Sequence, residues 1–206
     1  MFYDSLTGLP NAMLFLDRLQ QAVAHAARRQ QMVALLYMDI DGFKRISERH
    51  GVPAGDRLMQ EIAERLGRCI QRKEDTLARL CGDQFAMVLG GIDGVEGAMT
   101  VLGKVDRVMK EHFLIGNCEL SLTLSVGASI FPDDGKDWSA LLRSASIAMH
   151  QAKSAGGGSY CCYGKEEKKQ QGCGAVLQEA PLSPSLFKKS WTPGREGWAS
   201  GSMGWS

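Results

Sequence analysis

The sequence lacks a long hydrophobic run and an excess of charge of either sign. Apolar stretches such as residues 32–38 are far shorter than the roughly 18 residues that a membrane-spanning helix needs. The first residues, Met-Phe-Tyr-Asp-Ser, do not resemble a secretion signal, because no basic segment precedes an apolar one. With 24 Lys and Arg against 23 Asp and Glu, the net charge of +1 gives no general attraction to nucleic acid polymers or to anionic membranes.

The cysteines also lack the spacing of a metal or redox site. They lie at positions 69, 81, 118, 161, 162 and 173, without a C-x-x-C pair and without a histidine partner pattern. This arrangement favours free thiols over a zinc site. Free thiols persist in a reducing compartment, so the sequence predicts a cytoplasmic protein.

Composition divides the chain into a domain and a tail. The 206 residues, 44% hydrophobic and 23% charged, are enough for one globular domain with some chain left over. After residue 164 a charged run gives way to Gly, Ser and Pro, which cannot bury enough apolar area to offset the entropy of ordering. We therefore predict a domain at 1–164 and a disordered, low-complexity tail at 165–206. A partner-binding tail and the remnant of a lost second domain are the alternatives.

Hydrophobic periodicity predicts a domain of alternating helices and short strands. Helices are expected at 11–29, 43–49, 56–70, 95–113 and 138–154. Strands are expected at 32–38, 76–80, 85–89, 119–130 and 160–163, with the second and third joined as a hairpin. After the first helix this order is β-α-α-β-β-α-β-α-β. It is typical of an α/β (α+β sandwich) fold of ferredoxin-like type, with a central, mostly antiparallel five-stranded sheet flanked by helices.

Two turns that follow apolar strands each carry a carboxylate. Asp39 ends the run at 32–38, and Asp83 lies in the turn of the predicted hairpin. If the two strands are neighbours, these side chains lie at adjacent strand ends. One or two carboxylates completed by phosphate oxygens are a common Mg²⁺ site. The pair therefore predicts a site for a divalent cation and a phosphate ligand.

Several motifs agree with one another in order and spacing. They are Asp-Ser-Leu-Thr-Gly-Leu-Pro-Asn at 4–11, Asp-Ile-Asp-Gly-Phe-Lys at 39–44, His-Gly at 50–51, Gly-Asp at 55–56, Cys-Gly-Asp-Gln-Phe at 81–85, Leu-Ser-Val-Gly at 124–127 and Ala-Lys at 152–153. Over roughly residues 1–164 the chain resembles the GGDEF family, the diguanylate cyclases and their degenerate relatives. The resemblance implies the palm-type core of nucleotide cyclases, in agreement with the predicted element order.

The resemblance also implies a reaction and its site. In a cyclase of this family two GTP-loaded half-sites face each other, so a homodimer and Mg²⁺ or Mn²⁺ are expected. The positions of the metal ligands are Asp39, the Ile40 carbonyl and Asp83, and Asp83 with Gln84 occupies the catalytic motif. The family's nucleotide-binding positions correspond to Phe43, Lys44, Ser47, Asp56, Gly82 and Lys153.

Four positions depart from the family pattern. Gln84 stands in place of a glutamate, and an amide neither accepts a proton near pH 7 nor adds negative charge for a metal. Cys81 replaces a glycine, so a strained turn or an intruding thiol is expected there. Ser47 replaces an asparagine at the guanine site, and Gly157 replaces an arginine that would clamp phosphate. Together these changes indicate a decayed catalytic centre.

A second ligand site is indicated by Arg72 and Asp75, an R-x-x-D motif at the family's spacing before residue 81. In many relatives this motif is the inhibitory site for cyclic di-GMP. Arginine can donate a fork to guanine O6 and N7, and a carboxylate can accept from guanine N–H groups. A solvated ion pair at a helix end is the alternative interpretation.

We therefore expect a degenerate GGDEF domain that binds GTP, cyclic di-GMP or both as a regulatory module, with little or no cyclase activity. An active but impaired diguanylate cyclase is the second reading, because Asp39, Asp83, Asp56 and Lys153 are retained. A remnant with a purely structural role is the third.

Overall fold

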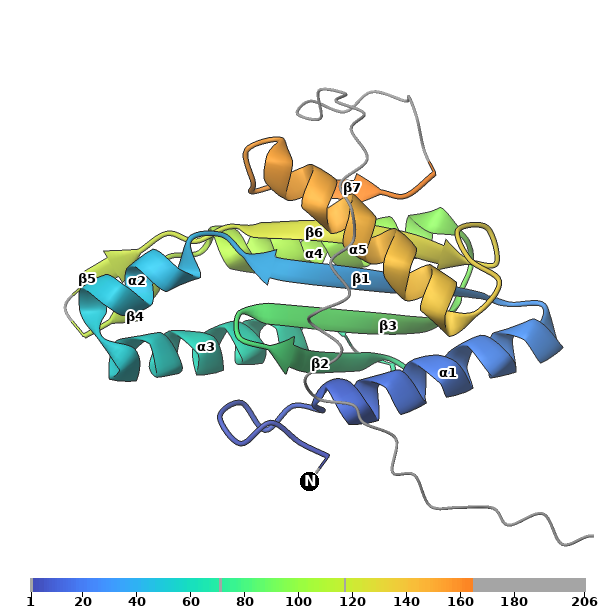
Figure 1. Cartoon of the computed structure of the whole chain (residues 1–206), viewed down its shortest axis with the longest axis horizontal. Helices are drawn as coiled ribbons and strands as arrows, with labels where there is room; N and C mark the ends of the chain where they lie inside the picture. The colour runs from blue at the N-terminus through green and yellow to red at the C-terminus, as the bar shows by residue number, and fades with distance from the viewer. Residues whose placement is uncertain (1, 71, 117, 165–206) are drawn as a thin grey trace, which may run out of the picture. The chain divides into compact units, whose positions relative to one another are not determined.

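The computed structural model describes residues 2–70, 72–116 and 118–164 (Figure 1). The predicted tail at 165–206 lies outside these described residues, so its disorder stays a prediction. In chain order the elements are α1 (Ala12–Arg29), β1 (Met32–Ile40), α2 (Phe43–His50), α3 (Val52–Gly67), β2 (Thr76–Cys81), β3 (Gln84–Ile92), α4 (Val95–Lys110), β4 (Phe113–Ile115), β5 (Cys118–Leu120), β6 (Leu124–Phe131), α5 (Trp138–Ser154) and β7 (Tyr160–Cys162).

A five-stranded sheet in the order β2-β3-β1-β6-β7 forms the centre of the fold. β1 is its middle strand and pairs antiparallel with β3 and with β6. β2 pairs antiparallel with β3, and β7 adds to β6 as the one parallel pair of this sheet in the described residues. The predicted fold class, with a mostly antiparallel five-stranded sheet, is confirmed.

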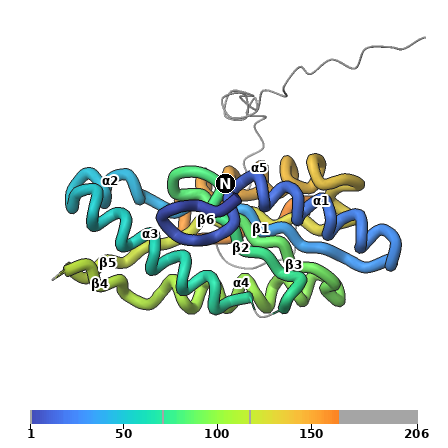
Figure 2. Tube along the Cα trace, turned by 90° about the horizontal axis from the view of Figure 1, so that it is seen from below, coloured from blue at the N-terminus to red at the C-terminus, as the bar shows by residue number. Residues whose placement is uncertain are grey.

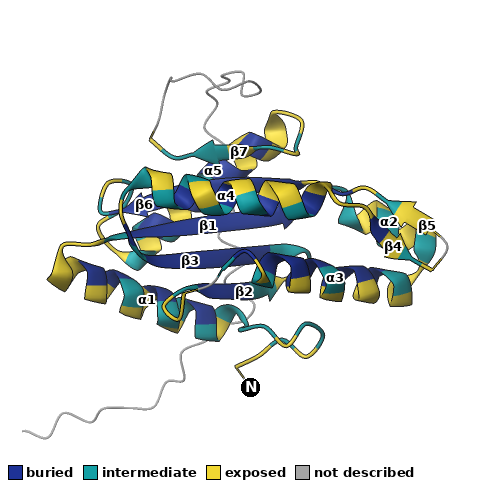
Figure 3. Ribbon diagram, turned by 180° about the vertical axis from the view of Figure 1, so that it is seen from behind, coloured by how far each residue is buried: buried dark blue, intermediate teal, exposed yellow. Residues whose placement is uncertain are grey.

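The alternation of side chains along β1 explains the layers on the two faces of the sheet. Even-numbered residues of β1, from Ala34 to Ile40, pack in one apolar cluster with α3 and α4. Odd-numbered residues, from Val33 to Tyr37, pack in a second cluster with α1 and α5. Figure 3 shows the buried strands between helices whose outward faces are exposed. Because both faces are covered, β1 is a continuous apolar run rather than an alternating one.

A close helix–sheet contact depends on Gly127 of β6. A Cβ atom placed there would lie 2.0 Å from the Ala145 carbonyl oxygen and 2.1 Å from the Met149 nitrogen of α5. These distances are far inside van der Waals contact, so no larger residue fits without moving α5. The close approach holds α5, which carries Lys153, against the strand next to β1.

Several predicted boundaries were wrong. The helix expected from residue 56 begins at Val52, with Pro53 in the first turn, where a missing N–H is tolerated. The strand expected at 119–130 is two strands, because β5 ends at Leu120 and β6 begins at Leu124. β5 instead pairs with β4 in a separate two-stranded sheet that the sequence analysis did not predict.

α4 ends at Lys110, before the predicted residue 113, because of the buried side chain of Arg65 in α3. Its guanidinium donates to the backbone carbonyls of Val108, Glu111 and His112 at 3.0, 2.7 and 2.7 Å. Its Cζ atom also lies 3.8 Å from the ring centre of Phe113. Carbonyls at a helix C-terminus lack intrahelical donors. By supplying those donors, Arg65 ends α4 and frees residue 113 to start β4 instead of continuing the predicted helix.

In the part of the chain that the structure describes, no helix is both long and apolar enough to cross a membrane. The thiols of Cys69, Cys81 and Cys118 are free, as predicted, and Cys173 lies outside the described residues.

Candidate functional site

The two predicted metal carboxylates lie at neighbouring strand ends, as expected. Asp39 of β1 is opposite Gln84 of β3 in the antiparallel register. The Ile40 N–H donates to the backbone oxygen of Asp83 at 3.2 Å, which joins the end of β1 to the β2–β3 turn. Asp39 is buried, with 5% of its surface exposed, so a partner for its charge is needed.

Lys153 provides that partner from the last turn of α5. Its Nζ donates to Asp39 Oδ1 at 2.5 Å. Burial lowers the pKa of Lys153, but the hydrogen bond to Asp39 and the charges of Asp39, Asp83 and Asp41 outweigh burial and raise that pKa. The predicted phosphate-binding lysine is thus a fixed cation beside the carboxylates.

Among these charged groups, the ionised form of Asp83 is disfavoured. Its pKa is raised first by burial and then by the negative charge of Asp39, against the smaller opposing effects of Lys153 and Arg79. A divalent cation between the two carboxylates would relieve this repulsion. The described residues contain no group of three or more His, Cys, Asp or Glu side chains around one point. Two carboxylates and the Ile40 carbonyl therefore fit Mg²⁺ or Mn²⁺ whose remaining ligands are phosphate oxygens or water.

The residue in the catalytic glutamate position, Gln84, is held by two donors. Its side-chain oxygen accepts from the Tyr37 hydroxyl at 3.0 Å and from the Cys81 thiol at 3.2 Å. Partial desolvation and the charge of Asp83 raise the pKa of the Cys81 thiol, which keeps the donor proton in place at neutral pH. The amide of Gln84 therefore belongs to a small neutral network beside the charged one.

The strain expected at Cys81 was not found. Within the described residues, Gln30 is the one non-glycine with a positive φ. Cys81 ends β2 with an exposed side chain, and the left-handed conformation of the turn falls on Gly82, with a φ of +53°. A side chain at position 81 is therefore tolerated by the backbone. The consequence of having Cys81 at this position is the hydrogen bond from its thiol to the Gln84 side chain.

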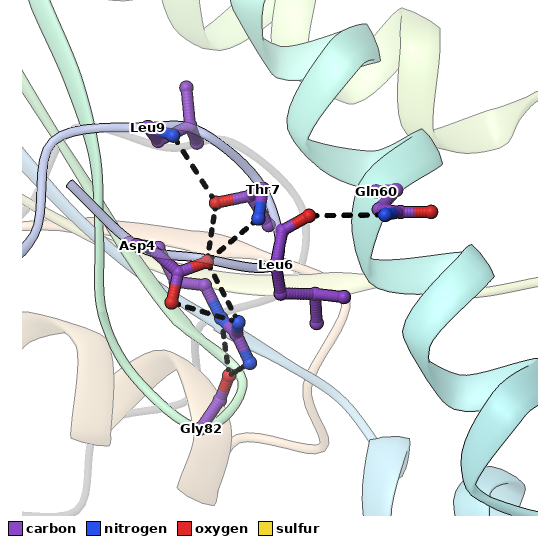
Figure 4. Close-up of polar contacts among 7 residues, drawn as sticks. Asp4, Leu6, Thr7, Leu9, Gln60 and Gly82 are labelled. Carbon is purple, nitrogen blue, oxygen red and sulfur yellow. Dashed lines mark hydrogen bonds and ion pairs between the residues drawn. The ribbon is translucent and has the colours of Figure 1, made fainter.

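Arg79, which the sequence analysis missed, ties the turn to the N-terminal segment (Figure 4). Its Nη1 lies 3.0 Å from Asp4 Oδ1, and its Nε and Nη2 donate to the Gly82 carbonyl at 3.0 and 2.8 Å. Burial raises the pKa of Asp4, but bonds from Thr7 and Arg79 outweigh it and lower that pKa. The sequence could have indicated this contact only through Asp4 in the 4–11 motif, and nothing in that motif identifies Arg79 as the partner of Asp4.

The predicted nucleotide residues of α2 and α3 surround the joint between these helices. Phe43 and Ser47 face Gly55, where an added Cβ would lie 3.0 Å from Ser47 Oγ and 3.6 Å from Phe43 Cζ. Asp56, the next residue, is exposed. The side chain of Lys44 is exposed and 3.9 Å from Glu48. Gly42, with a φ of +71°, directly precedes the first residue of α2, and no described side chain caps this helix end. Its first amides therefore suit a phosphate.

Gly157 stands where the family has an arginine, and the local backbone explains why an arginine would not fit. Gly157 has a φ of +75°, and a Cβ there would lie 3.0 Å from the Asp41 carboxylate. That carboxylate accepts from Thr123 Oγ1 at 2.7 Å, Ser125 Oγ at 2.6 Å and the Gly158 N–H at 2.8 Å. The loop after α5 is thus folded onto Asp41 instead of presenting a cation.

Arg72 and Asp75 lie in the turn before β2, and not at a helix end as the ion-pair alternative assumed. α3 ends at Gly67. Arg72 Nη1 donates to the Gly91 carbonyl at 3.2 Å, and Asp75 Oδ1 accepts from the Gly90 N–H at 3.3 Å. Burial raises the pKa of Asp75, against opposing hydrogen bonds from the Gly90 and Arg72 backbone amides. Both residues adjoin the far end of β3 from Gln84, so the two predicted sites are separate.

Comparison with known proteins agrees with this arrangement. The family model described as "Diguanylate cyclase, GGDEF domain" matches residues 1–159. The chain belongs to the GGDEF family. A solved structure of the GGDEF domain of PA1120 (TpbB or YfiN) from Pseudomonas aeruginosa has a TM-score of 0.75 at 33% identity, covering 78% of this chain and 94% of that one.

The similar curated GGDEF proteins carry different activities in their names. The chain is 37% identical over 161 residues to the bifunctional diguanylate cyclase/cyclic di-GMP phosphodiesterase MucR of Pseudomonas aeruginosa, covering 78% of this chain and 23% of that protein. It is 36% identical over 154 residues to the cyclic di-GMP phosphodiesterase NbdA of the same species, covering 75% and 19%. This GGDEF domain thus spans a quarter or less of these relatives.

Proposed function

We propose that this GGDEF domain is a regulatory module in cyclic di-GMP signalling, which binds Mg²⁺–GTP, cyclic di-GMP or both and synthesises little or no cyclic di-GMP. We expect it to act in the cytoplasm, which its free cysteines favour. The family and the similar proteins support the signalling context. The loss of synthesis is inferred from the site.

The observation that carries this proposal is the neutral network around Gln84. Its amide oxygen is occupied by the Tyr37 hydroxyl and the Cys81 thiol. An amide cannot take a proton near pH 7 and adds no negative charge beside a metal. Gly157 adds to the loss, because a folded glycine loop stands where the family has a phosphate-clamping arginine.

Nucleotide binding is supported by the groups that remain. Asp39, Asp83 and Lys153 form one cluster of two carboxylates and a cation. In such a site the carboxylates would hold Mg²⁺ or Mn²⁺, which neutralises phosphate charge when bound. Lys153 would orient the phosphates, and the uncapped end of α2 would donate backbone N–H groups to them. Arg72 and Asp75 would recognise the guanine edges of cyclic di-GMP.

An impaired diguanylate cyclase is the second candidate, and the same cluster favours it, because both metal carboxylates are kept. In that case two copies of the domain would have to bring their sites face to face. Ser47 would still weaken guanine recognition, since one hydroxyl cannot replace the paired donor and acceptor of an amide.

Calorimetric titration and a product assay together test the proposal. The purified chain is titrated with GTP and with cyclic di-GMP in the presence of Mg²⁺, then incubated with GTP at high protein concentration and examined by chromatography. We expect binding of at least one ligand and no cyclic di-GMP product. Product formed at an ordinary cyclase rate would favour the second candidate. Absence of binding for both ligands would leave only a structural role.

A further inference from the structure

A groove of about 560 Å³ lies between α2 and the chain segment 120–123, outside the predicted GTP and cyclic di-GMP sites. Figure 2 shows α2 at the same end of the sheet as the β4–β5 hairpin, and the C-terminal end of α1 at the other. One wall of the groove carries Arg45, Arg49 and His50, and the other carries Leu120 and the largely buried Leu122. Gly42, next to the helix end proposed for phosphate binding, borders the groove, but the predicted metal, guanine and cyclic di-GMP residues do not line it.

Helix geometry separates this groove from the predicted guanine site. Arg45 and Arg49 are four residues apart and therefore lie on one face of α2. Phe43 and Ser47 lie on the opposite face, against Gly55 of α3. A ligand held by Arg45 and Arg49 would thus contact the side of α2 that faces away from the predicted guanine site.

The cations of the groove have no partners within the described residues. The side chains of Arg45, Arg49 and His50 form no ion pair or hydrogen bond there, whereas Lys44 on the same helix lies 3.9 Å from Glu48. Asp41 also lines the groove, but its oxygens already accept from Thr123, Ser125 and Gly158. An anion would therefore find two free guanidinium groups.

We infer that this groove binds a small phosphate-bearing ligand with an apolar part, such as a nucleoside diphosphate, without a divalent cation. Guanidinium groups match phosphate oxygens in geometry and stay charged at every physiological pH. The apolar part would cover Leu120, whereas Leu122 is itself buried in the core, and the charge of Asp41 favours a phosphate position nearer Arg49. The volume lies within the roughly 300–1,000 Å³ of small-molecule sites.

Amide chemical shifts of the full chain in a metal chelator test this inference, with inorganic diphosphate and adenosine 5′-diphosphate as probes. The chelator removes the cation that the Asp39 site requires, so failure of the proposed GTP site would not affect the result. Both probes are expected to shift the amides of residues 45–50 and 120–123. Adenosine 5′-diphosphate should bind more tightly, because its base can cover Leu120.

The double variant Arg45→Gln/Arg49→Gln should bind both probes at least about tenfold more weakly, a factor that corresponds to about 1.4 kcal/mol. The control Arg28→Gln/Arg29→Gln removes the same charge from the exposed end of α1 and should bind like the parent. Equal losses in both variants would mean that only net charge matters and would overturn the inference. Shifts confined to residues 82 and 153, or equal affinity for the two probes, would also overturn the inference.

Discussion

The Tyr37 hydroxyl lies 3.0 Å from the side-chain oxygen of Gln84, across the antiparallel pair of β1 and β3. Burial raises the pKa of Tyr37, and the charges of Cys81, once it ionises at alkaline pH, and of Asp39 raise it further, so this hydroxyl stays protonated at neutral pH and donates. The Cys81 thiol donates to the same oxygen. Two neutral donors thus converge on the position where the family has a carboxylate, next to the two charged carboxylates of the site.

Restoring the family motif should not restore synthesis. In Cys81→Gly/Gln84→Glu the new carboxylate keeps the Tyr37 donor, so we expect a folded variant. The phosphate-clamping cation is still missing at Gly157. Loss of one preorganised electrostatic group commonly reduces the rate by about 10²–10³. Chromatography of GTP incubated with Mg²⁺ or Mn²⁺ should show no cyclic di-GMP for the parent and none for the variant.

A variant that produced cyclic di-GMP at an ordinary rate would show that residues 81 and 84 alone had silenced the domain. The Gly157 loop would then be irrelevant to turnover. A thermal unfolding curve close to that of the parent is the control, since it shows that the variant is folded.

GTP affinity should depend on a divalent cation and disappear in Asp39→Asn. Asp39 is buried beside Lys153 and Asp83, and a cation would link these carboxylates to phosphate oxygens. Titration of GTP by calorimetry, with Mg²⁺ and with a chelator, measures both effects. The control Asp133→Asn changes an exposed carboxylate and should bind like the parent. Equal binding with and without Mg²⁺ would remove the metal assignment.

The strands and helices of the central layers could be predicted because their patterns are local. The continuous apolar run at 32–38 and the four-residue spacing in α3 each reflect burial against the sheet. The β4–β5 hairpin could not be predicted in the same way. Residue 113 continues the apolar pattern of α4, and the residue that ends α4 is Arg65, far away in the sequence.

The site was predictable where one motif supplies both the chemistry and the position. Asp39 lies near the end of β1 and Asp83 directly precedes β3, and because these two strands pair, the two carboxylates lie close together as the motifs predicted. Arg79 was missed because its partners, Asp4 and Gly82, are brought together only by the fold. Strain at Cys81 was predicted from the glycine that it replaces, yet the left-handed φ belongs to Gly82.

Removing the charge of Asp83 should stabilise the fold at neutral pH in the absence of metal. Its pKa is raised in the folded state by burial and by Asp39. Between the unfolded and folded pKa values the folded state binds more protons, so stability falls as pH rises through the folded value. Asp83→Asn should therefore be more stable than the parent at pH 7, with the difference vanishing below the ordinary pKa of 3.8.

Urea unfolding in chelator at pH 7 and at pH 3.5 measures this difference. Asp133→Asn is the control, because the side chain is exposed and its removal should change little. A parent that is more stable than Asp83→Asn at pH 7 would mean that Asp83 is stabilised by Lys153 and Arg79 more than it is penalised by burial and by Asp39.

Arg79→Ala should destabilise the domain by about 1.5–3 kcal/mol, the range for hydrogen bonds to charged groups. Arg79 is largely buried, with 15% of its side chain exposed, and it joins Asp4 to the Gly82 carbonyl. Arg79→Lys should recover only part of the loss, because one ammonium lacks the fork that serves both partners. Arg57→Ala on exposed α3 surface is the control in urea unfolding. Equal effects at residues 57 and 79 would contradict this role.

Cyclic di-GMP should bind through Arg72 and Asp75 independently of the metal carboxylates. Arg72 and Asp75 lie beside Gly90 and Gly91, at the other end of β3 from Gln84. Arg72→Ala should therefore abolish calorimetric binding, and Asp75→Ala should weaken it about tenfold, the factor that about 1.4 kcal/mol represents. Asp39→Asn should leave it intact.

The neighbouring exposed cation Lys73 provides the matched control, because Lys73→Ala removes the same charge from the same turn. If Arg72→Ala bound cyclic di-GMP like the parent, the contact between Arg72 and the Gly91 carbonyl would be only structural. If Lys73→Ala lost as much affinity as Arg72→Ala, charge alone would account for binding. A loss specific to Arg72, shared by Asp75→Ala and absent in Asp39→Asn, is the pattern that a guanine-reading pair requires, since each side chain would hydrogen-bond the base edge separately.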